Sequence, residues 1–439
     1  MNRPNILYIH SHDTGRCVSP YGYAVDTPNI HALANEGILF RNAFCAAPTC
    51  SPSRAGLLSG SSPHSCGILG LAHRGFRMQE DKHLVNFLKK AGYTAHLCGV
   101  QHETDNPRAS GYDTIHWRIP RPSVGEGTAS AFAEEFLDSK PQQPFFLSVG
   151  FTDTHRPYPA LEPQDDTKYI QVPSCVPDLP ETRSDWAAYR KSVKNLDNGM
   201  GVVLSALKRS GLMDSTIILC TTDHGIAFPR MKCNLTDAGM GVMLIVRWPE
   251  RIQPGIVCDA LVSQIDVFPT LCELLSLEPP NWLEGKSLLP LLDDPQHEIN
   301  DEVFGEVTFH ASYEPQRSIR TTRYKYIRRF GSRTELTRPN IDASPTKSVL
   351  LEAGFGRFEQ VREQLYDLRL DPHEFRNLAD DTGHKSVLDD LRTRLQDWMT
   401  RTNDPLLQGE VPLPAGARIT DPNEPEPEGR MIVNEGNKP

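Results

Sequence analysis

Short apolar segments of strand length alternate along this 439-residue chain with segments of helical periodicity. A helical stripe follows Thr27-Pro28, a pair typical of a helix start, and a long helix is expected over 183–210. Because parallel strands need crossover connections, usually helices, this alternation is typical of a parallel sheet with both faces covered. The sequence therefore predicts an α/β fold with a large, mainly parallel sheet, whose strands lie at 5–10, 38–40, 94–98, 145–149, 217–220 and 242–246.

The pattern changes where Pro and Asp cluster over 290–296. One helix is expected at about 385–402, after strand-like segments at 302–308, 317–320 and 324–329. We predict a catalytic α/β domain over 1–295 and a smaller C-terminal α+β domain over 296–403. The Pro-, Glu- and Gly-rich segment 404–439 is expected to form an extended strap or tail.

Acidic residues outnumber basic ones, and the formal net charge is −10. Phosphate neutralisation needs a basic face, so we expect no nucleic-acid partner. No apolar run approaches the roughly 18–20 residues of a membrane span, so no membrane partner is expected either. The first apolar segment begins at Ile6, which leaves no room for a signal peptide. The chain as given is expected to be cytoplasmic, or periplasmic or secreted if its N-terminus was trimmed. Nothing in the sequence indicates an oligomeric state.

Ten cysteines are scattered along the chain, and none forms a CxxC pair. A structural zinc cluster is therefore not expected. Several of the cysteines lie inside apolar runs, which is typical of buried free thiols in a reducing compartment. We expect this for nine of the ten, the exception being Cys50.

Polar clusters directly follow four of the predicted strands. Ligands of open α/β sheets collect at the carboxyl ends of the strands. A single cluster of this kind would be explained by polar residues that follow the end of a strand and hydrogen-bond to a neighbouring loop. Four clusters at equivalent strand ends predict a shared metal and acid–base site: His10-Ser11-His12-Asp13, Gly99-Val100-Gln101-His102, Thr152-Asp153-Thr154-His155 and Thr222-Asp223-His224-Gly225.

A fifth motif, Cys50-Ser51-Pro52-Ser53-Arg54, precedes a helical segment that ends in Ser59-Gly60. This C-x-P-S-R motif resembles the signature of the type I sulfatases, within the alkaline phosphatase superfamily. The resemblance covers nearly the whole chain and is greatest to the N-sulfoglucosamine sulfohydrolase (sulfamidase) subgroup. Supporting segments are Thr27–Leu33, Phe40–Phe44, Phe145-Phe146-Leu147 with His155-Arg156, Asp223–Pro229, Leu365–Leu368, Asp371–Glu374, Asn377-Leu378, and Trp398 with Asp404-Pro405.

The resemblance implies that Cys50 is oxidised to formylglycine by a maturation enzyme, the formylglycine-generating enzyme. One hydroxyl of the hydrated aldehyde then attacks sulfur, and the other expels sulfate as the aldehyde reforms. Pro52, in the first helical turn, puts residue 50 at a helix N-terminus, where an anion such as sulfate is favoured. The alternative is an unmodified buried cysteine. We expect Cys50→Ala to spare folding, because the site should be a surface cleft.

The resemblance also assigns roles to other residues. Arg54 would neutralise and orient residue 50, with a surface salt bridge as the alternative. His102 and His155 would contact the sulfuryl group and protonate the leaving atom; core histidines are the alternative. Lys232 would bind sulfate, or be a solvated loop lysine. One divalent metal ion would be held by Cys50, Asp13, Asp223 and His224, with His12 as a further ligand.

The chain departs from the family pattern at two positions. It has His12-Asp13 where most sulfatases have Asp-Asp, and Val100 replaces the lysine of a Gly-Lys-x-His motif. The family resemblance implies Ca²⁺, but two imidazoles suit Mn²⁺ better than an all-oxygen calcium cage. The absence of the lysine at Val100 affects how the sulfate and the leaving group are bound, and therefore which substrate the site accepts.

The sequence thus predicts a sulfatase that hydrolyses a sulfate ester or sulfamate of a small molecule or saccharide. A phosphonate monoester or phosphodiester hydrolase on the same scaffold is an alternative, which the Asp223-His224 pair favours. A catalytically degenerate binding protein is a second alternative, supported by His12 and Val100. Retention of Cys50 within its maturation motif argues against that second alternative.

Overall fold

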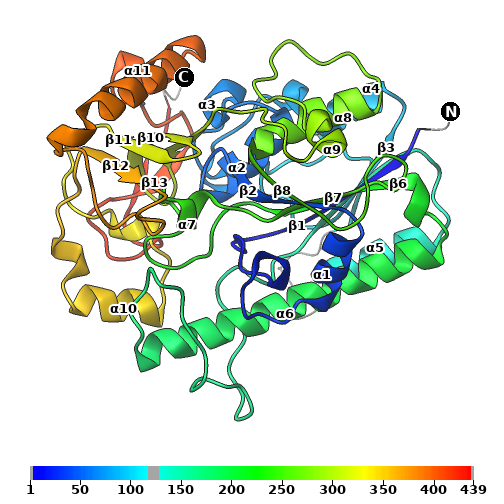
Figure 1. Cartoon of the computed structure of the whole chain (residues 1–439), viewed down its shortest axis with the longest axis horizontal. Helices are drawn as coiled ribbons and strands as arrows, with labels where there is room; N and C mark the ends of the chain where they lie inside the picture. The colour runs from blue at the N-terminus through cyan, green and yellow to red at the C-terminus, as the bar shows by residue number, and fades with distance from the viewer. Residues whose placement is uncertain (1–2, 117–127, 437–439) are drawn as a thin grey trace.

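The computed structural model describes residues 3–116 and 128–436 (Figure 1). Within these ranges, eight strands form one sheet in the order β4-β3-β5-β1-β6-β7-β2-β8. The strands are β1 (Asn5–Ser11), β2 (Ile38–Phe44), β3 (Thr94–Gly99), β4 (Thr114–His116), β5 (Phe145–Gly150), β6 (Thr216–Thr222), β7 (Leu244–Arg247) and β8 (Ile256–Ser263). The predicted α/β class with a large, mainly parallel sheet is confirmed.

Strand β7 departs from the parallel arrangement, because it runs antiparallel to both β6 and β2. The connection from β6 to β7 contains only the four-residue helix α7 (Asp237–Met240). At about 1.5 Å per residue, α7 is far too short to return along the length of the sheet. The connection therefore stays at one edge of the sheet, and the chain re-enters in the opposite direction.

Helices cover both faces of the large sheet (Figure 1). Alternate residues of β1 enter different cores: Leu7 and Ile9 pack with one set of helices, and Ile6 and Tyr8 with the other. Burial of each such side chain contributes about 1.5–3 kcal/mol. The first set is α1 (Pro28–Asn35), α5 (Thr128–Asp138) and α6 (Pro180–Arg209); the second is α2 (Cys50–Ser59), α4 (Leu84–Lys90), α8 (Val267–Leu274) and α9 (Leu289–Asp293).

A smaller antiparallel sheet, in the order β12-β11-β10-β9, lies beside the large one. Helix α11 (Lys385–Arg401) covers it, and the Trp398 ring stacks on Phe304 at 4.8 Å between ring centroids (Figure 1). The strands are β9 (Glu302–Phe309), β10 (Tyr313–Thr321), β11 (Tyr324–Arg329) and β12 (Glu363–Asp367). The predicted domain boundaries at 295/296 and 403/404 stay predictions, and residues 1–2, 117–127 and 437–439 lie outside the described residues.

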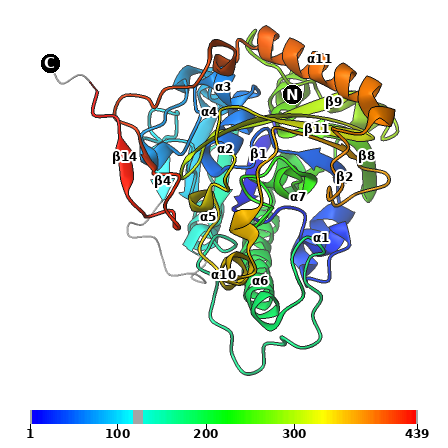
Figure 2. The ribbon, with the colours of Figure 1, turned by 90° about the vertical axis from the view of Figure 1, so that its left-hand side faces the viewer.

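The smaller sheet is anchored to the rest of the molecule by segments on both sides. Helix α10 (Pro345–Glu352) lies against α6, where Thr346 Oγ1 donates to Asp185 Oδ2 at 2.6 Å (Figure 2). The C-terminal segment forms a hairpin of β13 (Arg418–Thr420) and β14 (Met431–Val433), and Arg74, which precedes α4, donates to Thr420 Oγ1. The short helix α3 (Pro63–Cys66) also packs on this side.

All ten cysteines lie in the described ranges and are free thiols. Nine of them are buried, and Cys175 is half-buried. No helix within residues 3–116 and 128–436 is long and apolar enough to cross a bilayer.

Candidate active site

The four polar clusters predicted from the sequence meet at one edge of the large sheet. Strands β3, β5, β1 and β6 are consecutive parallel neighbours, so their carboxyl ends coincide. In register, Ser11 pairs with Thr222 and Gly99 pairs with Gly150. The residues that follow these positions are therefore delivered to a common site.

The centre of this site is a compact group of ligand atoms. One atom each from His12, Asp13, Cys50 and Asp223 lies within 4.8 Å of all the others. His224 Nε2 completes the group, 3.3 Å from Asp13 Oδ1 and 3.4 Å from Cys50 Sγ. All five residues are at most 2 % exposed. We call these five residues the catalytic cluster.

Backbone geometry at β1 and β6 aims these side chains inward. Asp13 has a φ of 45°, in the left-handed region that non-glycine residues adopt at a cost. Its N–H donates to Asp223 Oδ1 at 2.8 Å, which locks the two strand ends together. His224 Nδ1 lies 2.8 Å from the Gly225 carbonyl and donates to it, so Nε2 presents its lone pair to the cluster.

The catalytic cluster contains polar atoms that the described residues leave without hydrogen-bond partners. These atoms are His12 Nδ1, His12 Nε2 and Asp13 Oδ1, all of them buried. His12 Nδ1 lies 3.1 Å from Asp223 Oδ2, but without hydrogen-bond geometry. Buried polar atoms without partners cost about 1–3 kcal/mol each. Carboxylate oxygens and imidazole nitrogens together are a donor set that fits a divalent cation.

Cys50 is the first residue of α2, as the position of Pro52 predicted. The free N–H groups and the dipole of this ten-residue helix therefore point at the catalytic cluster. Burial raises the pKa of the Cys50 thiol, so the unmodified side chain is a protonated and weak nucleophile. The expectation of a surface cleft is wrong for this side chain, which is 1 % exposed.

Arg54 lies one helical turn after Cys50 and is 2 % exposed, which excludes the surface salt bridge considered as its alternative. Its Nη2 donates to Asp223 Oδ2 at 3.0 Å and to the Ser11 carbonyl at 2.7 Å. Burial opposes ionisation of Asp223, but His224, Arg54 and His12 outweigh it and hold the Asp223 pKa well below its usual range. Arg54 thus fixes the charge and position of Asp223; its predicted action on residue 50 stays a prediction.

The two predicted acid–base histidines both lie next to His12. The His12 ring centroid is 5.5 Å from that of His102 and 5.4 Å from that of His155. His155 Nδ1 lies 2.6 Å from the Arg156 carbonyl, so its Nε2 is left to face the site. His102 Nε2 lies 2.9 Å from Nδ1 of His73, which stacks on it and is exposed at the rim.

Lys232 is 5 % exposed, which excludes the solvated loop lysine considered as its alternative. Its Nζ lies 3.1 Å from Asp13 Oδ2 and 3.0 Å from Asp342 Oδ2. Burial opposes protonation, but Asp13 and Asp342 outweigh it and raise the pKa of Lys232 well above its usual range. The site therefore holds a permanent cation beside the catalytic cluster.

Sequence reasoning missed three residues of this site: His73, His310 and Asp342. Asp342 and the buried His310 come from the smaller sheet and its loops, and both interact electrostatically with Lys232. Neither belongs to a recognisable motif, and no sequence signal identifies them. His73 lies in the short 3-10 helix Ala72–Arg74 after α3, and only its contact with His102 in the fold identifies it.

Comparisons with known proteins agree with this geometry. Residues 4–277 match the family model described as "Sulfatase", and residues 230–349 match "N-sulphoglucosamine sulphohydrolase, C-terminal". The chain is 31% identical to human N-sulphoglucosamine sulphohydrolase, over 87% of each chain. It is 30% identical to an ulvan-active sulfatase of Formosa agariphila, over 94% of this chain and 83% of the other.

Solved structures share the fold. A putative sulfatase from Bacteroides fragilis superposes with a TM-score of 0.74 at 21% identity, over 93% of this chain and 98% of the other. Another matching structure, solved in complex with its substrate D-glucosamine-2-N,6-O-disulfate, has a TM-score of 0.69 at 19% identity, over 92% and 98% of the chains.

Proposed function

This chain belongs to the sulfatase family, and from that premise we propose that it removes a sulfuryl group from a sulfated saccharide, with residue 50 as the nucleophile. As a sulfatase, it hydrolyses a sulfate ester or a sulfamate. The observation that carries the proposal is the position of Cys50, at the N-terminus of α2 and among His12, Asp13 and Asp223.

The proposed site also needs two groups that are not among the twenty encoded amino acids: a modified residue 50 and a metal ion. Formylglycine at position 50, installed by a maturation enzyme, would supply a hydroxyl nucleophile in place of an inert thiol. A divalent cation held by the catalytic cluster would supply Lewis-acid stabilisation of negative charge. His12 and His224 support Mn²⁺ over Ca²⁺ for that position, because imidazole is a poor calcium ligand.

The chain's own residues bind and orient the substrate in this proposal. Lys232 supplies a fixed positive charge for a sulfuryl oxygen, and the α2 N-terminus supplies further donors. Arg54 keeps Asp223 ionised and in place. Ion pairs and hydrogen bonds of the chain itself already hold these groups in place, which is what preorganised stabilisation of an anion requires.

His155 is the proposed donor of a proton to the leaving oxygen or nitrogen. Its Nδ1 is held by the Arg156 carbonyl, and Arg156 is itself fixed by two hydrogen bonds to Asp185. The ring orientation is therefore set by a chain of contacts outside the reacting centre. His102, braced by His73, is proposed to contact the sulfuryl group.

A saccharide substrate is supported by what similar proteins act on. The relatives include human N-sulphoglucosamine sulphohydrolase and ulvan-active sulfatases, and one structural neighbour binds a glucosamine disulfate. Initial rates of sulfate release from sulfated and N-sulfated glucosamine test the proposal, with Cys50→Ala as control. Absence of sulfate release from both sugars by matured enzyme would contradict it.

Hydrolysis of phosphonate monoesters or phosphodiesters is the second candidate. The observation that favours it is His224, whose Nε2 faces both Cys50 and Asp13 at the position where many sulfatases have asparagine. Initial rates on matched aryl sulfate and aryl phosphonate esters separate the two activities. A higher kcat/KM on the phosphonate would assign the site to the second candidate.

A further inference from the structure

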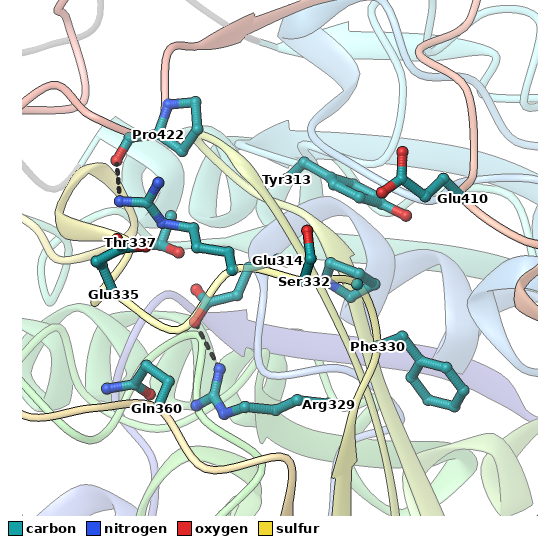
Figure 3. A pocket seen from close by; sticks show the side chains of 13 residues that line it. Tyr313, Glu314, Arg329, Phe330, Ser332, Glu335, Thr337, Gln360, Glu410 and Pro422 are labelled. Carbon is teal, nitrogen blue, oxygen red and sulfur yellow. Dashed lines mark hydrogen bonds and ion pairs between the residues drawn. The ribbon is translucent and has the colours of Figure 1, made fainter.

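A cavity of about 200 Å³ lies in the smaller C-terminal unit, outside the catalytic cluster. Its walls are the β10–β11 hairpin, the segment that follows β11, and part of the C-terminal segment (Figure 3). Pockets for drug-sized ligands are typically about 300–1,000 Å³, so this cavity has room for one small ring. The lining includes Tyr313, Glu314, Arg329, Ser332, Arg333 and Glu410.

The lining combines an aromatic face with donors and acceptors that point into one space. Tyr313 presents its ring beside the Glu410 carboxylate, and Ser332 lies between them and Glu314 (Figure 3). Arg329 Nη1 donates to Glu314 Oε1 at 2.7 Å, which fixes both groups at the cavity wall. A flat apolar surface with carboxylate acceptors and guanidinium donors around it suits the hydroxyl-bearing ring of a sugar.

The charges of the lining residues indicate which class of sugar the cavity could bind. Its lining carries two guanidinium groups and three carboxylates, because Glu335 is also present. Arg329 is already neutralised by Glu314. Arg333 hydrogen-bonds to Asn423 and to the Pro422 carbonyl, and it offsets only one of the two remaining carboxylates, Glu335 and Glu410. The net negative charge of the lining disfavours a sulfate or uronate group in this cavity, since like charges repel. An uncharged pyranose unit is therefore the better match.

The cavity is connected to the catalytic cluster by one short loop. Asn340 Nδ2 donates to Glu314 Oε2 at 2.8 Å, on the cavity side. Two residues later, Asp342 contacts Lys232, which in turn contacts Asp13. Two residues span at most about 7 Å of extended chain. One loop therefore borders the cavity at Asn340 and contacts Lys232, beside the catalytic cluster, at Asp342, an arrangement that suits an oligosaccharide extending from one site to the other.

We propose that this cavity is a subsite for an uncharged sugar unit of the substrate, while the sulfated unit occupies the catalytic cluster. This inference rests on the proposed saccharide sulfatase activity and deepens it. It assigns the enzyme to oligosaccharides or polymers, because a sulfated monosaccharide cannot reach both sites. The cavity then contributes to substrate binding and not to the chemical step.

The test is to fill the cavity without removing any of its contacts. Ser332→Trp adds an indole at an exposed lining position, and Ser386→Trp on α11 is the matched control outside this cavity. We expect Ser332→Trp to raise KM for a sulfated trisaccharide about tenfold at unchanged kcat. Its kcat/KM on a sulfated monosaccharide should stay within about twofold of wild type, and the control should change neither value.

Unchanged KM for the trisaccharide in Ser332→Trp would overturn the subsite and leave the sulfatase activity intact. Equal losses on trisaccharide and monosaccharide would also overturn it, because the variant would then perturb the catalytic cluster. A wild type that releases no sulfate from either saccharide would refute the proposed function instead. Binding of the uncharged disaccharide N,N′-diacetylchitobiose, followed by saturation-transfer NMR, gives a readout independent of activity. Contact of this disaccharide that persists in Ser332→Trp would contradict the assignment.

Discussion

The catalytic cluster and a second group, His64, Glu306 and Asp404, are built from the same kinds of side chain. Both groups are compact enough to hold a cation. The second group lies between α3 and the smaller sheet, where Arg317 inserts its guanidinium. Arg317 Nη2 donates to Asp404 Oδ1 at 3.0 Å, and its Nε lies 3.5 Å from Glu306. A fixed cation of the chain itself already occupies that group.

The catalytic cluster has its fixed cations at the periphery instead. Arg54 and Lys232 each contact one carboxylate of the cluster, while His12 and one oxygen of Asp13 have no hydrogen-bond partner among the described residues. The two groups therefore have similar residue types but different roles. In the second group the chain satisfies both carboxylates, and only His64 Nε2 lacks a hydrogen-bond partner among the described residues. The catalytic cluster has three such buried ligand atoms, one of them a carboxylate oxygen, and is therefore arranged for something that binds there.

The largest effect is expected at the nucleophile. Cys50→Ala should abolish sulfate release, because alanine cannot be converted to formylglycine and offers no hydroxyl. The free energy of unfolding should change by less than about 1.5 kcal/mol, since a single small side chain is removed. Peptide mass spectrometry of residues 42–54 should show the aldehyde or its hydrate in matured wild type. Activity in Cys50→Ala equal to wild type would refute the mechanism.

Removal of one carboxylate from each group should distinguish the catalytic cluster from the second group most clearly. Asp223→Ala should remove the bound metal and lower kcat by about 10⁴-fold, because the cluster loses a central ligand and Arg54 loses its partner. Asp404→Ala should leave metal content and kcat unchanged. Elemental analysis and initial rates measure both. Full metal content in Asp223→Ala would mean that the cation is bound elsewhere.

Removal of the proposed acid should show a dependence on the leaving group. His155→Ala should slow hydrolysis of an alkyl sulfate or sulfamate about 10²–10⁴-fold, since these leaving atoms need a proton. An aryl sulfate with a nitrophenolate leaving group needs little protonation and should be much less affected. Equal losses on both substrates would assign His155 to binding of the sulfuryl oxygens and make His102 the better candidate for the acid.

The second group should respond in stability and not in catalysis. Asp404→Ala leaves the guanidinium of Arg317 buried without its carboxylate partner, at a cost of about 3–5 kcal/mol. Burial opposes ionisation of Asp404, but Arg317 outweighs it and lowers the Asp404 pKa. Chemical denaturation measures the loss. Asp389→Ala on the exposed face of α11 is the control, and an equal effect in both variants would contradict the distinction.

Much of the catalytic centre could be predicted from the sequence, because local patterns determine it. Apolar runs identify β1, β3, β5 and β6, and the topology of parallel strands brings the residues after them together. The start of α2 at Cys50 follows from a local motif. These features depend on short-range sequence, which periodicity and spacing can read.

Other parts of the site depend on tertiary packing and could not be predicted. Asp342 and His310 reach Lys232 only because the smaller sheet docks beside the large one. The direction of β7 and the stacking of His73 on His102 are likewise set by connections and contacts between distant segments. No periodicity in the sequence encodes them.

A smaller effect, which depends on pH, is expected at Glu374, a buried carboxyl beside Lys325 and Asp237. Its Oε2 accepts from the Asp237 N–H at 2.6 Å, and its Oε1 lies 3.3 Å from Lys325 Nζ. Burial, reinforced by the Asp237 charge and opposed by Lys325, raises the pKa of Glu374 from 4.5 to about 7. The folded state therefore keeps a proton that the unfolded chain releases above pH 4.5.

The sign follows from this difference in proton binding. Between about pH 4.5 and 7 the unfolded chain loses the Glu374 proton first, so the free energy of unfolding falls as pH rises, by up to about 3 kcal/mol. Glu374→Gln keeps the acceptor for Asp237 but cannot ionise, so this slope should disappear. Urea denaturation at pH 5 and pH 8 measures it, with the exposed Glu352→Gln as control. If the free energy of unfolding depended on pH equally in wild type and Glu374→Gln, Lys325 would keep the Glu374 carboxylate ionised in the folded state. Arg317 has that effect on Asp404.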